Sequence, residues 1–110
     1  MGASRSYRVR WAEVARCDLI EIFEFIASDD PLAAAGVLRR FATRARSLER
    51  MPERGRVVPE LKAVGVQSFR ELVVTPWRVI CRISGDTVFV LAVLDGRRNL
   101  EDVLLDRLVR

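Results

Sequence analysis

Arginine side chains interrupt the most apolar stretch of this chain, and they are the residues best suited to chemistry. Arg70 lies in one β-rich run, and Arg78 and Arg82 lie within the next. Arg97 and Arg98 follow the third run. Guanidinium groups bind anions through paired N–H donors and can stabilise the charge that develops when a phosphodiester is attacked. These positions indicate either an anion-binding surface or the cationic part of a cleavage site.

A cleavage site would also need groups that carry protons, and the chain offers few of them. Attack by a 2′-hydroxyl of RNA needs a base, and the leaving 5′-oxygen needs an acid. The sequence contains no His and a single Tyr, Tyr7, near its start. Glu71 and Asp95 are conceivable bases, but Glu71 should point away from Arg70 because neighbouring side chains alternate along a strand. These residues favour binding over catalysis.

Three predicted strands must position the arginines. Residues 69–74, 77–83 and 87–94 are rich in β-branched and aromatic side chains and are bounded by turn residues. The segment 84–87 fits a two-residue hairpin turn, in which Gly85 can take a positive φ. This turn predicts the pairs Ile83–Val88, Cys81–Val90, Val79–Ala92 and Trp77–Leu94 on one face, and Arg78–Val93, Ile80–Leu91 and Arg82–Phe89 on the other.

The two faces of this predicted hairpin differ in character. The first carries only apolar pairs and should belong to the core, with Trp77 on its apolar side. The second sets Arg78 and Arg82 among apolar side chains, so we expect something anionic or another chain to cover it. The alternative is that Arg78 and Arg82 flank the sheet and pair with Glu71 in a cross-strand salt bridge. The preceding turn leaves one register open. A two-residue Thr75-Pro76 turn places Arg70 on the face opposite Arg78, whereas a three-residue turn brings the two arginines together.

The remaining elements complete one α+β domain of 110 residues. Residues 7–11 alternate and predict a short strand, and apolar residues recur at helical spacing from 12 to 29. Asp30 and Pro31 are a helix start signal for a second helix that should reach about Met51, and Gly36 within it suggests close helix–helix approach.

The order β-α-α-β-β-β-α predicts a helical hairpin packed on an antiparallel sheet, with the first strand at the edge beside the last or in the middle. We expect Phe23, Ile26, Phe41, Leu48, Val79, Val90 and Ala92 to be buried between helices and sheet.

Two further segments are predicted outside this core. Residues 54–68 should form a connecting loop, with 58–61 on the surface. Asn99 can cap a C-terminal helix whose apolar residues, Leu104 and Leu108 among them, cover more than one face. A terminal helix with so much apolar surface usually needs a partner, so we expect Leu104 and Leu108 to contribute to binding.

The charge distribution favours an anionic partner. The net charge is +4, and residues 39–82 carry ten arginines and Lys62 against four acids, a local charge of +7. Such a block can attract nucleic acid or an acidic protein. Cys17 and Cys81 have no metal-like spacing and suggest free thiols in a reducing compartment, so we expect no metal and no cofactor. No run reaches the roughly 18 apolar residues of a membrane span, and no secretory leader is evident, so we expect a cytoplasmic protein without membrane contact.

The order of elements and several local patterns resemble the RelE/ParE superfamily of bacterial toxins from type II toxin–antitoxin modules. The ParE branch fits best, since its members carry a Leu…Pro…Gly-Arg turn and a closing basic dipeptide after the last strand. Here Leu48, Pro52 and Gly55-Arg56 match the turn, and Arg97-Arg98 matches the dipeptide. The matching segments are 15–27, 30–35, 48–56, 70–72, 77–82 and 93–98.

The resemblance implies a growth-inhibiting toxin that a cognate antitoxin neutralises in a hetero-oligomer. ParE-like members bind DNA gyrase and trap it on broken DNA, with no established chemistry of their own. RelE-like members cut messenger RNA in the ribosome. A third possibility is a toxin fold that has lost toxicity or has another target. We expect gyrase binding, through Arg70, Arg78, Arg82, Arg97, Arg98, Leu104 and Leu108.

The ribonuclease alternative would use Arg70, Arg78 and Arg97, which lie at or near basic positions of RelE-like toxins. For this reason the resemblance favours the three-residue turn, which brings Arg70 and Arg78 together. The C-terminal Tyr of those nucleases has no match, because the corresponding stretch is Asp102-Val103-Leu104. Leu72 also stands where such enzymes often have a second basic residue. The resemblance therefore implies a binding protein rather than an enzyme.

Overall fold

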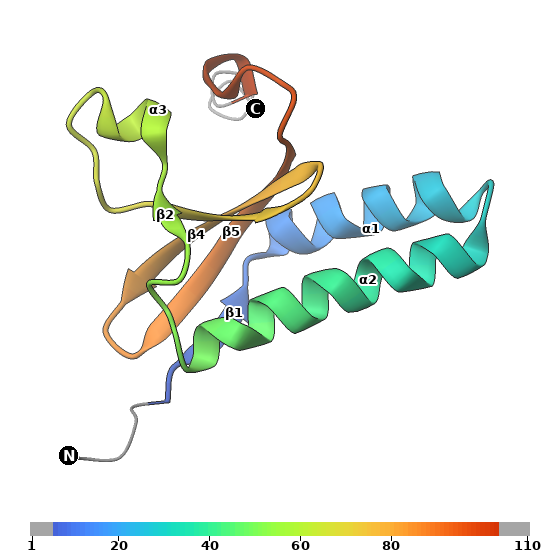
Figure 1. Cartoon of the computed structure of the whole chain (residues 1–110), viewed down its shortest axis with the longest axis horizontal. Helices are drawn as coiled ribbons and strands as arrows, with labels where there is room; N and C mark the ends of the chain where they lie inside the picture. Colours follow the sequence, from blue (N-terminus) through green and yellow to red (C-terminus); the bar gives the residue numbers. More distant parts are fainter. Residues whose placement is uncertain (1–5, 104–110) are drawn as a thin grey trace.

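The computed structural model describes residues 6–103 (Figure 1). A two-helix hairpin lies against one face of a five-stranded sheet, and a short helix and the C-terminal end of the described chain lie on the other. A helical stretch begins at Leu100 and continues to the end of the described residues. The other elements are β1 (Arg8–Trp11), α1 (Glu13–Ala27), α2 (Pro31–Arg46), the 3₁₀ turn η1 (Ser47–Glu49), β2 (Arg56–Val57), α3 (Pro59–Lys62), β3 (Arg70–Val74), β4 (Trp77–Ser84) and β5 (Thr87–Asp95).

The strands follow the order β1-β5-β4-β3-β2. β1 pairs with β5 in parallel, and the other neighbours are antiparallel. The predicted position of the first strand at the edge beside the last one is confirmed. The order β-α-α-β-β-β-α also holds, but β2 and α3 lie within the predicted loop 54–68. Neither has a sequence pattern of its own, because β2 has only two residues and α3 a single turn.

The main core lies between the α1–α2 hairpin and the sheet. Phe41 and Leu48 are buried there, and the Phe41 ring packs against Trp77 with 5.3 Å between ring centroids. Trp77 lies on the core face as predicted. Phe23 and Ile26 are only half-buried, because the hairpin projects past the end of the sheet (Figure 1). The buried residues of this core are Ala15, Phe41, Leu48, Leu72, Val74, Val79, Cys81, Val88, Val90 and Val93.

A β-bulge corrects part of the predicted hairpin register. Ser84 and Thr87 close the turn, and Gly85 has φ +61° as expected. The predicted pairs hold from Ile83–Val88 to Cys81–Val90, and Arg82 faces Phe89. Beyond Cys81 the register shifts by one residue, so Leu91 is the extra residue of a bulge. The pairs predicted beyond it are wrong, and the observed pairs are Ile80–Ala92, Val79–Val93, Arg78–Leu94 and Trp77–Asp95.

The bulge also changes which side chains of β5 enter the core. Val93 is buried against the helices, whereas Ala92 packs with the cluster on the opposite face. The prediction that Ala92 would lie between helices and sheet is therefore wrong. Val79 and Val90 keep their predicted positions. An extra residue reverses the alternation of all that follow it along the strand.

The turn between β3 and β4 has two residues, since Val74 pairs with Trp77. This register pairs Arg70 with Cys81 and Val73 with Arg78. Arg70 therefore lies on the helix-covered face of the sheet, and Arg78 lies on the other face. The three-residue alternative, which would have brought these two arginines together, is wrong.

The chain itself covers part of the second sheet face. Val58, predicted on the surface, is fully buried and forms a second core with Ile80 and Leu94. Leu100 and Val103, at the end of the described chain, complete this cluster. The backbone N–H of Val58 donates to the carbonyl oxygen of Phe69 at 3.0 Å, and this bond holds the start of α3 beside the start of β3. The sheet face that we expected a partner to cover is thus partly covered by Val58, Leu100 and Val103 of the same chain.

Both predicted helix caps are confirmed. The Asp30 carboxylate accepts a hydrogen bond from the backbone N–H of Ala33 at 3.1 Å, with Pro31 at the first helical position. Asn99 accepts from the backbone N–H of Glu101 at 2.9 Å. Leu104 and Leu108 lie outside the described residues. Among the helices of the described part, none is long and apolar enough to cross a membrane.

The glycines Gly36 and Gly55 have different surroundings. A Cβ at Gly55 would lie 2.4 Å from the backbone oxygen of Glu71, so β3 leaves no room for a side chain. A Cβ at Gly36 would meet only the guanidinium of Arg39, at 3.7 Å. The prediction that Gly36 marks close helix–helix approach is wrong, because no α1 atom lies near it.

Replacing these glycines should change stability in opposite directions. Gly55→Ala should lower the free energy of unfolding by about 1–3 kcal/mol, because β3 must move. Gly36→Ala should raise it by about 0.5–1 kcal/mol, because it removes backbone freedom from the unfolded chain within a helix. Urea unfolding monitored by circular dichroism measures both. Equal stability of the two variants would contradict the close β2–β3 contact.

Candidate binding site

Arg78 is buried, with 9% of its surface exposed, and lies in an ionic network on the outer face of the sheet. Its Nε donates to Oε1 of Glu71 at 2.7 Å, and its two terminal nitrogens donate to the two Glu60 oxygens at 2.8 Å each. Arg56 completes the network by donating from Nε to the other Glu71 oxygen at 2.7 Å. The network joins α3, β2, β3 and β4.

These contacts determine the charge states of the network. Hydrogen bonds from Arg78 lower the pKa of Glu60 from 4.5 to about 2, and Glu60 and Glu71 raise the pKa of Arg78 above its usual value. The Arg78 guanidinium already has two carboxylate partners within its own chain. In this structure Arg78 therefore holds α3 against the sheet.

The Arg78 side chain also packs against the 95–98 turn, which carries Arg97. A Cβ at Gly96 would lie 2.8 Å from the Pro76 carbonyl oxygen and 3.1 Å from Cγ of Arg78. The Gly96 N–H donates to that same Pro76 oxygen at 2.8 Å. The aliphatic part of Arg78 thus supports the 95–98 turn, while its guanidinium points to Glu60 and Glu71.

Arg97 is paired with Asp95 within this turn. The Arg97 backbone N–H and Nε donate to Oδ1 of Asp95 at 2.9 and 3.0 Å, and a terminal nitrogen donates to Oδ2 at 2.9 Å. These bonds lower the pKa of Asp95 from 3.8 to about 2 and raise that of Arg97. Arg98 is exposed and makes no ion pair with a described residue.

Arg70 and Arg82 lie far from this turn along the sheet. Arg70 donates to the Gly55 carbonyl oxygen at 2.8 Å and holds the loop before β2. Arg82 is exposed near the hairpin end of β4, on the outer face. There the register places Phe89 between Arg82 and Arg10, with neither arginine ion-paired to the described part of the chain. The structure brings Arg97 and Arg98 together but separates Arg70, Arg78 and Arg82.

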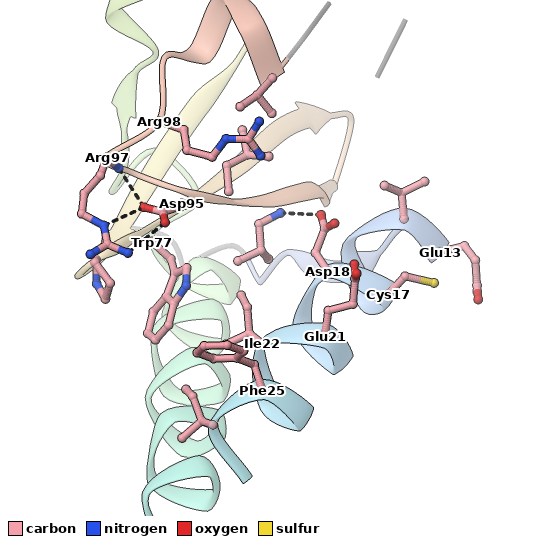
Figure 2. A pocket seen from close by; sticks show the side chains of 16 residues that line it. Glu13, Cys17, Asp18, Glu21, Ile22, Phe25, Trp77, Asp95, Arg97 and Arg98 are labelled. Atoms are coloured by element: carbon pink, nitrogen blue, oxygen red, sulfur yellow. Dashed lines mark hydrogen bonds and ion pairs between the residues drawn. The ribbon is translucent and has the colours of Figure 1, made fainter. Parts of the chain in front are cut away.

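An open groove of about 930 Å³ lies between α1 and the end of the β4–β5 pair that is opposite the 84–87 turn, where β4 begins and β5 ends (Figure 2). Figure 2 shows Arg97 and Arg98 on one side of it and the acids of α1 on the other. Apolar side chains lie between them, and Phe25 is 81% exposed. Asp18 accepts from the backbone N–H of Val93 at 2.9 Å and ties α1 to β5. The residues that line the groove include Glu13, Glu21, Phe25, Trp77, Arg97 and Arg98.

This groove was not predicted from the sequence, apart from Arg97 and Arg98. A signal for it exists in α1, where Val14, Cys17, Glu21 and Phe25 recur at helical spacing and line one side. Trp77 was predicted only as a core residue, but it also lines the groove. Among residues 6–103, no group of three His, Cys, Asp or Glu side chains could hold a metal ion.

Comparison with known proteins shows which family this sequence belongs to. A sequence model described as "ParE toxin of type II toxin-antitoxin system, parDE" matches residues 9–100. The chain belongs to the ParE toxin family. This membership confirms the resemblance to the RelE/ParE superfamily, and it identifies the chain as a type II toxin–antitoxin toxin by family.

Relatives carry both ParE and RelE names. The chain is 32% identical to Toxin ParE3 of Caulobacter vibrioides over 84 residues, which are 76% of this chain and 80% of that protein. It is 36% identical to putative toxin Y4kP of Sinorhizobium fredii over 99 residues, 88% of this chain and 96% of the relative. It is also 40% identical to Toxin RelE2 of C. vibrioides over 73 residues, 66% of this chain and 75% of that toxin.

Solved structures share the fold. The chromosomal ParDE toxin–antitoxin system of P. aeruginosa matches with a TM-score of 0.68 and 19% identity, over 84% of this chain and 98% of that one. The RelBE2 toxin–antitoxin complex of Mycobacterium tuberculosis matches with a TM-score of 0.56 and 26% identity, over 82% and 98% respectively. The fold is therefore that of ParE and RelE toxins.

The Arg78 network should give the protein a defined acid sensitivity. The pKa of Glu60 is lower in the folded state, so its ion pair stabilises the fold above about pH 4.5 and is lost as the pH falls toward 2. At pH 7 Glu60→Gln should cost about 1–2 kcal/mol of unfolding free energy, a moderate value because Glu60 is partly exposed. Urea unfolding of both proteins from pH 7 to 2.5 should show this difference shrinking below pH 4.5. A difference that is independent of pH would contradict the assignment.

Proposed function

We propose that this chain is a growth-inhibiting toxin that binds DNA gyrase without catalysing a reaction, and that a cognate antitoxin neutralises it. Family membership supports a toxin, since the matching family model is that of the parDE systems. The observation that carries the choice of a binding mechanism is the separation of the arginines that a ribonuclease would need.

Three features of these arginines weigh against phosphodiester cleavage. Arg70 and Arg78 lie on opposite faces of the sheet. Arg78 is bound by two carboxylates, and Arg97 by one. Cleavage needs cations grouped around one phosphate, so this arrangement does not fit it.

The candidate bases are equally poorly placed. Both oxygens of Glu71 accept hydrogen bonds from arginines, and the side chain is fully buried. Asp95 has its pKa lowered to about 2, far below the neutral range in which a general base works best. The sequence has no His to replace them. A gyrase-binding toxin needs no such group.

The groove is our candidate for the antitoxin site. Its exposed apolar residues, Phe25 above all, need cover. Arg97 and Arg98 on one side and Glu13 and Glu21 on the other would fix the register of a peptide with complementary charges. The two solved relatives were determined as toxin–antitoxin systems or complexes. We therefore propose a toxin–antitoxin hetero-oligomer in the cytoplasm.

A second candidate function is ribosome-dependent cleavage of messenger RNA. It is favoured by the 40% identity to Toxin RelE2 over 73 residues. A toxin fold that has lost its activity is the third possibility.

Expression of the chain from an inducible promoter, with two assays on the purified protein, separates these functions. We expect growth to stop, gyrase supercoiling to be lost with accumulation of cleaved DNA complexes, and ribosome-bound messenger to remain intact. Arg97→Ala combined with Arg98→Ala should weaken the inhibition, because we expect these two exposed cations to contact gyrase when no antitoxin covers them, whereas Lys62→Ala on α3 should not.

Two outcomes would contradict the proposal. Messenger cut at defined positions with supercoiling unchanged would assign the ribonuclease function. Normal growth with neither effect would identify an inactive toxin fold.

A further inference from the structure

A second hollow, of about 470 Å³, lies along α2 beside the end of β3 and shares no residue with the groove. It is shallow and open to solvent, and α2 supplies most of its lining. Its residues are Gly36, Arg39, Arg40, Thr43, Arg44 and Val74. Three of these six residues are arginines, and none is a carboxylate.

The arginines of this hollow have few partners among the described residues. Arg40 donates from a terminal nitrogen to the Thr75 carbonyl oxygen at 3.0 Å. Arg39 folds back over Gly36 and makes no hydrogen bond or ion pair with the described chain. The Nε of Arg44 is buried and has no hydrogen-bond partner among the described residues. A buried donor without an acceptor is unfavourable. The three guanidinium groups also lie together with no carboxylate among the residues of the hollow.

A phosphate group in the hollow would accept hydrogen bonds from its exposed donors, on Arg39, Arg40 and Thr43. Guanidinium groups bind phosphate oxygens through two parallel N–H bonds, and the Thr43 hydroxyl is a further donor in the same hollow. Gly36 has no side chain, which leaves room for an anion beside the Arg39 guanidinium. The hollow thus has the donors and the open access that a phosphate site needs.

The surroundings favour a polymer of phosphates over a single small anion. Arg46, Arg50 and Arg54 follow the hollow's arginines along the chain and are exposed, and Glu49 and Glu53 are the acids among them. An excess of exposed arginines in one part of the chain suits a nucleic-acid backbone, where each contact with a phosphate releases counter-ions. We propose that the hollow binds a backbone phosphate of double-stranded DNA, and that α2 contacts the DNA held by gyrase. This inference rests on the proposed function.

The test is binding of a 20-base-pair duplex, measured by fluorescence anisotropy between 50 and 200 mM salt. Arg39→Gln combined with Arg44→Gln should weaken binding by about tenfold or more and reduce the slope of log affinity against log salt by about 2. Arg16→Gln combined with Arg8→Gln, which removes the same charge from exposed positions outside the hollow, should change affinity much less. Circular dichroism checks that all variants fold.

Each result bears on the proposal in one direction. Equal loss in both double variants would show a general charge effect and overturn it. Saturation of the hollow by inorganic phosphate, with no duplex binding, would overturn the DNA assignment. Gyrase inhibition lost in the Arg39/Arg44 variant with duplex binding intact would mean a protein contact, and would also overturn it.

The same variants separate this inference from the proposed function. Inhibition of gyrase by the parent and the Arg39/Arg44 variant to the same extent would refute the α2 contact while leaving the gyrase function standing. Duplex binding through Arg39 and Arg44 without gyrase inhibition by the parent would support the phosphate site and refute the gyrase function.

Discussion

The ion pairs of Arg78 are the interaction on which the outer half of this structure depends. Its guanidinium joins Glu71 on β3 to Glu60 on α3, and its aliphatic part supports the turn at Gly96. A buried charge is tolerated only where it is paired and hydrogen-bonded. Both carboxylates are therefore needed to keep Arg78 within the sheet, and with it the segment that buries Val58 in the second core.

This arrangement changes how the arginines of the strands are interpreted. In the sequence, Arg78 is a cation among apolar residues, which suggests either a site for an external anion or a cross-strand salt bridge with Glu71. In the structure the anions are Glu60 and Glu71 of the same chain. The surfaces left for partners lie elsewhere, at the groove beside Arg97 and Arg98 and at the hollow on α2. Binding and structural support are thus divided between different arginines.

The sequence predicted the elements that local signals determine. The Asp30 cap, the Gly85 turn and the alternation of β4 and β5 near that turn are confirmed, as is the family. The first strand takes one of its two predicted positions, and β2 was not predicted. It did not predict the bulge at Leu91, because the residues on both sides of it are apolar and no local signal marks the extra residue. It also did not pair Arg78 with Glu60, 18 residues away, because an ion pair across a loop leaves no periodic pattern. The groove was missed because it requires the relative positions of α1 and the 95–98 turn.

The most direct test of this account is a double-mutant cycle on Arg78 and Glu71, with unfolding free energy and growth inhibition measured for each protein. Each single change to Ala should cost about 3–5 kcal/mol, because it leaves a buried charge with an incomplete set of partners. The double variant should cost less than the sum, with a coupling of about 1–3 kcal/mol. A coupling near zero, with Arg78→Ala fully stable yet no longer inhibitory, would show that Arg78 serves a binding partner rather than the fold, and would contradict the account.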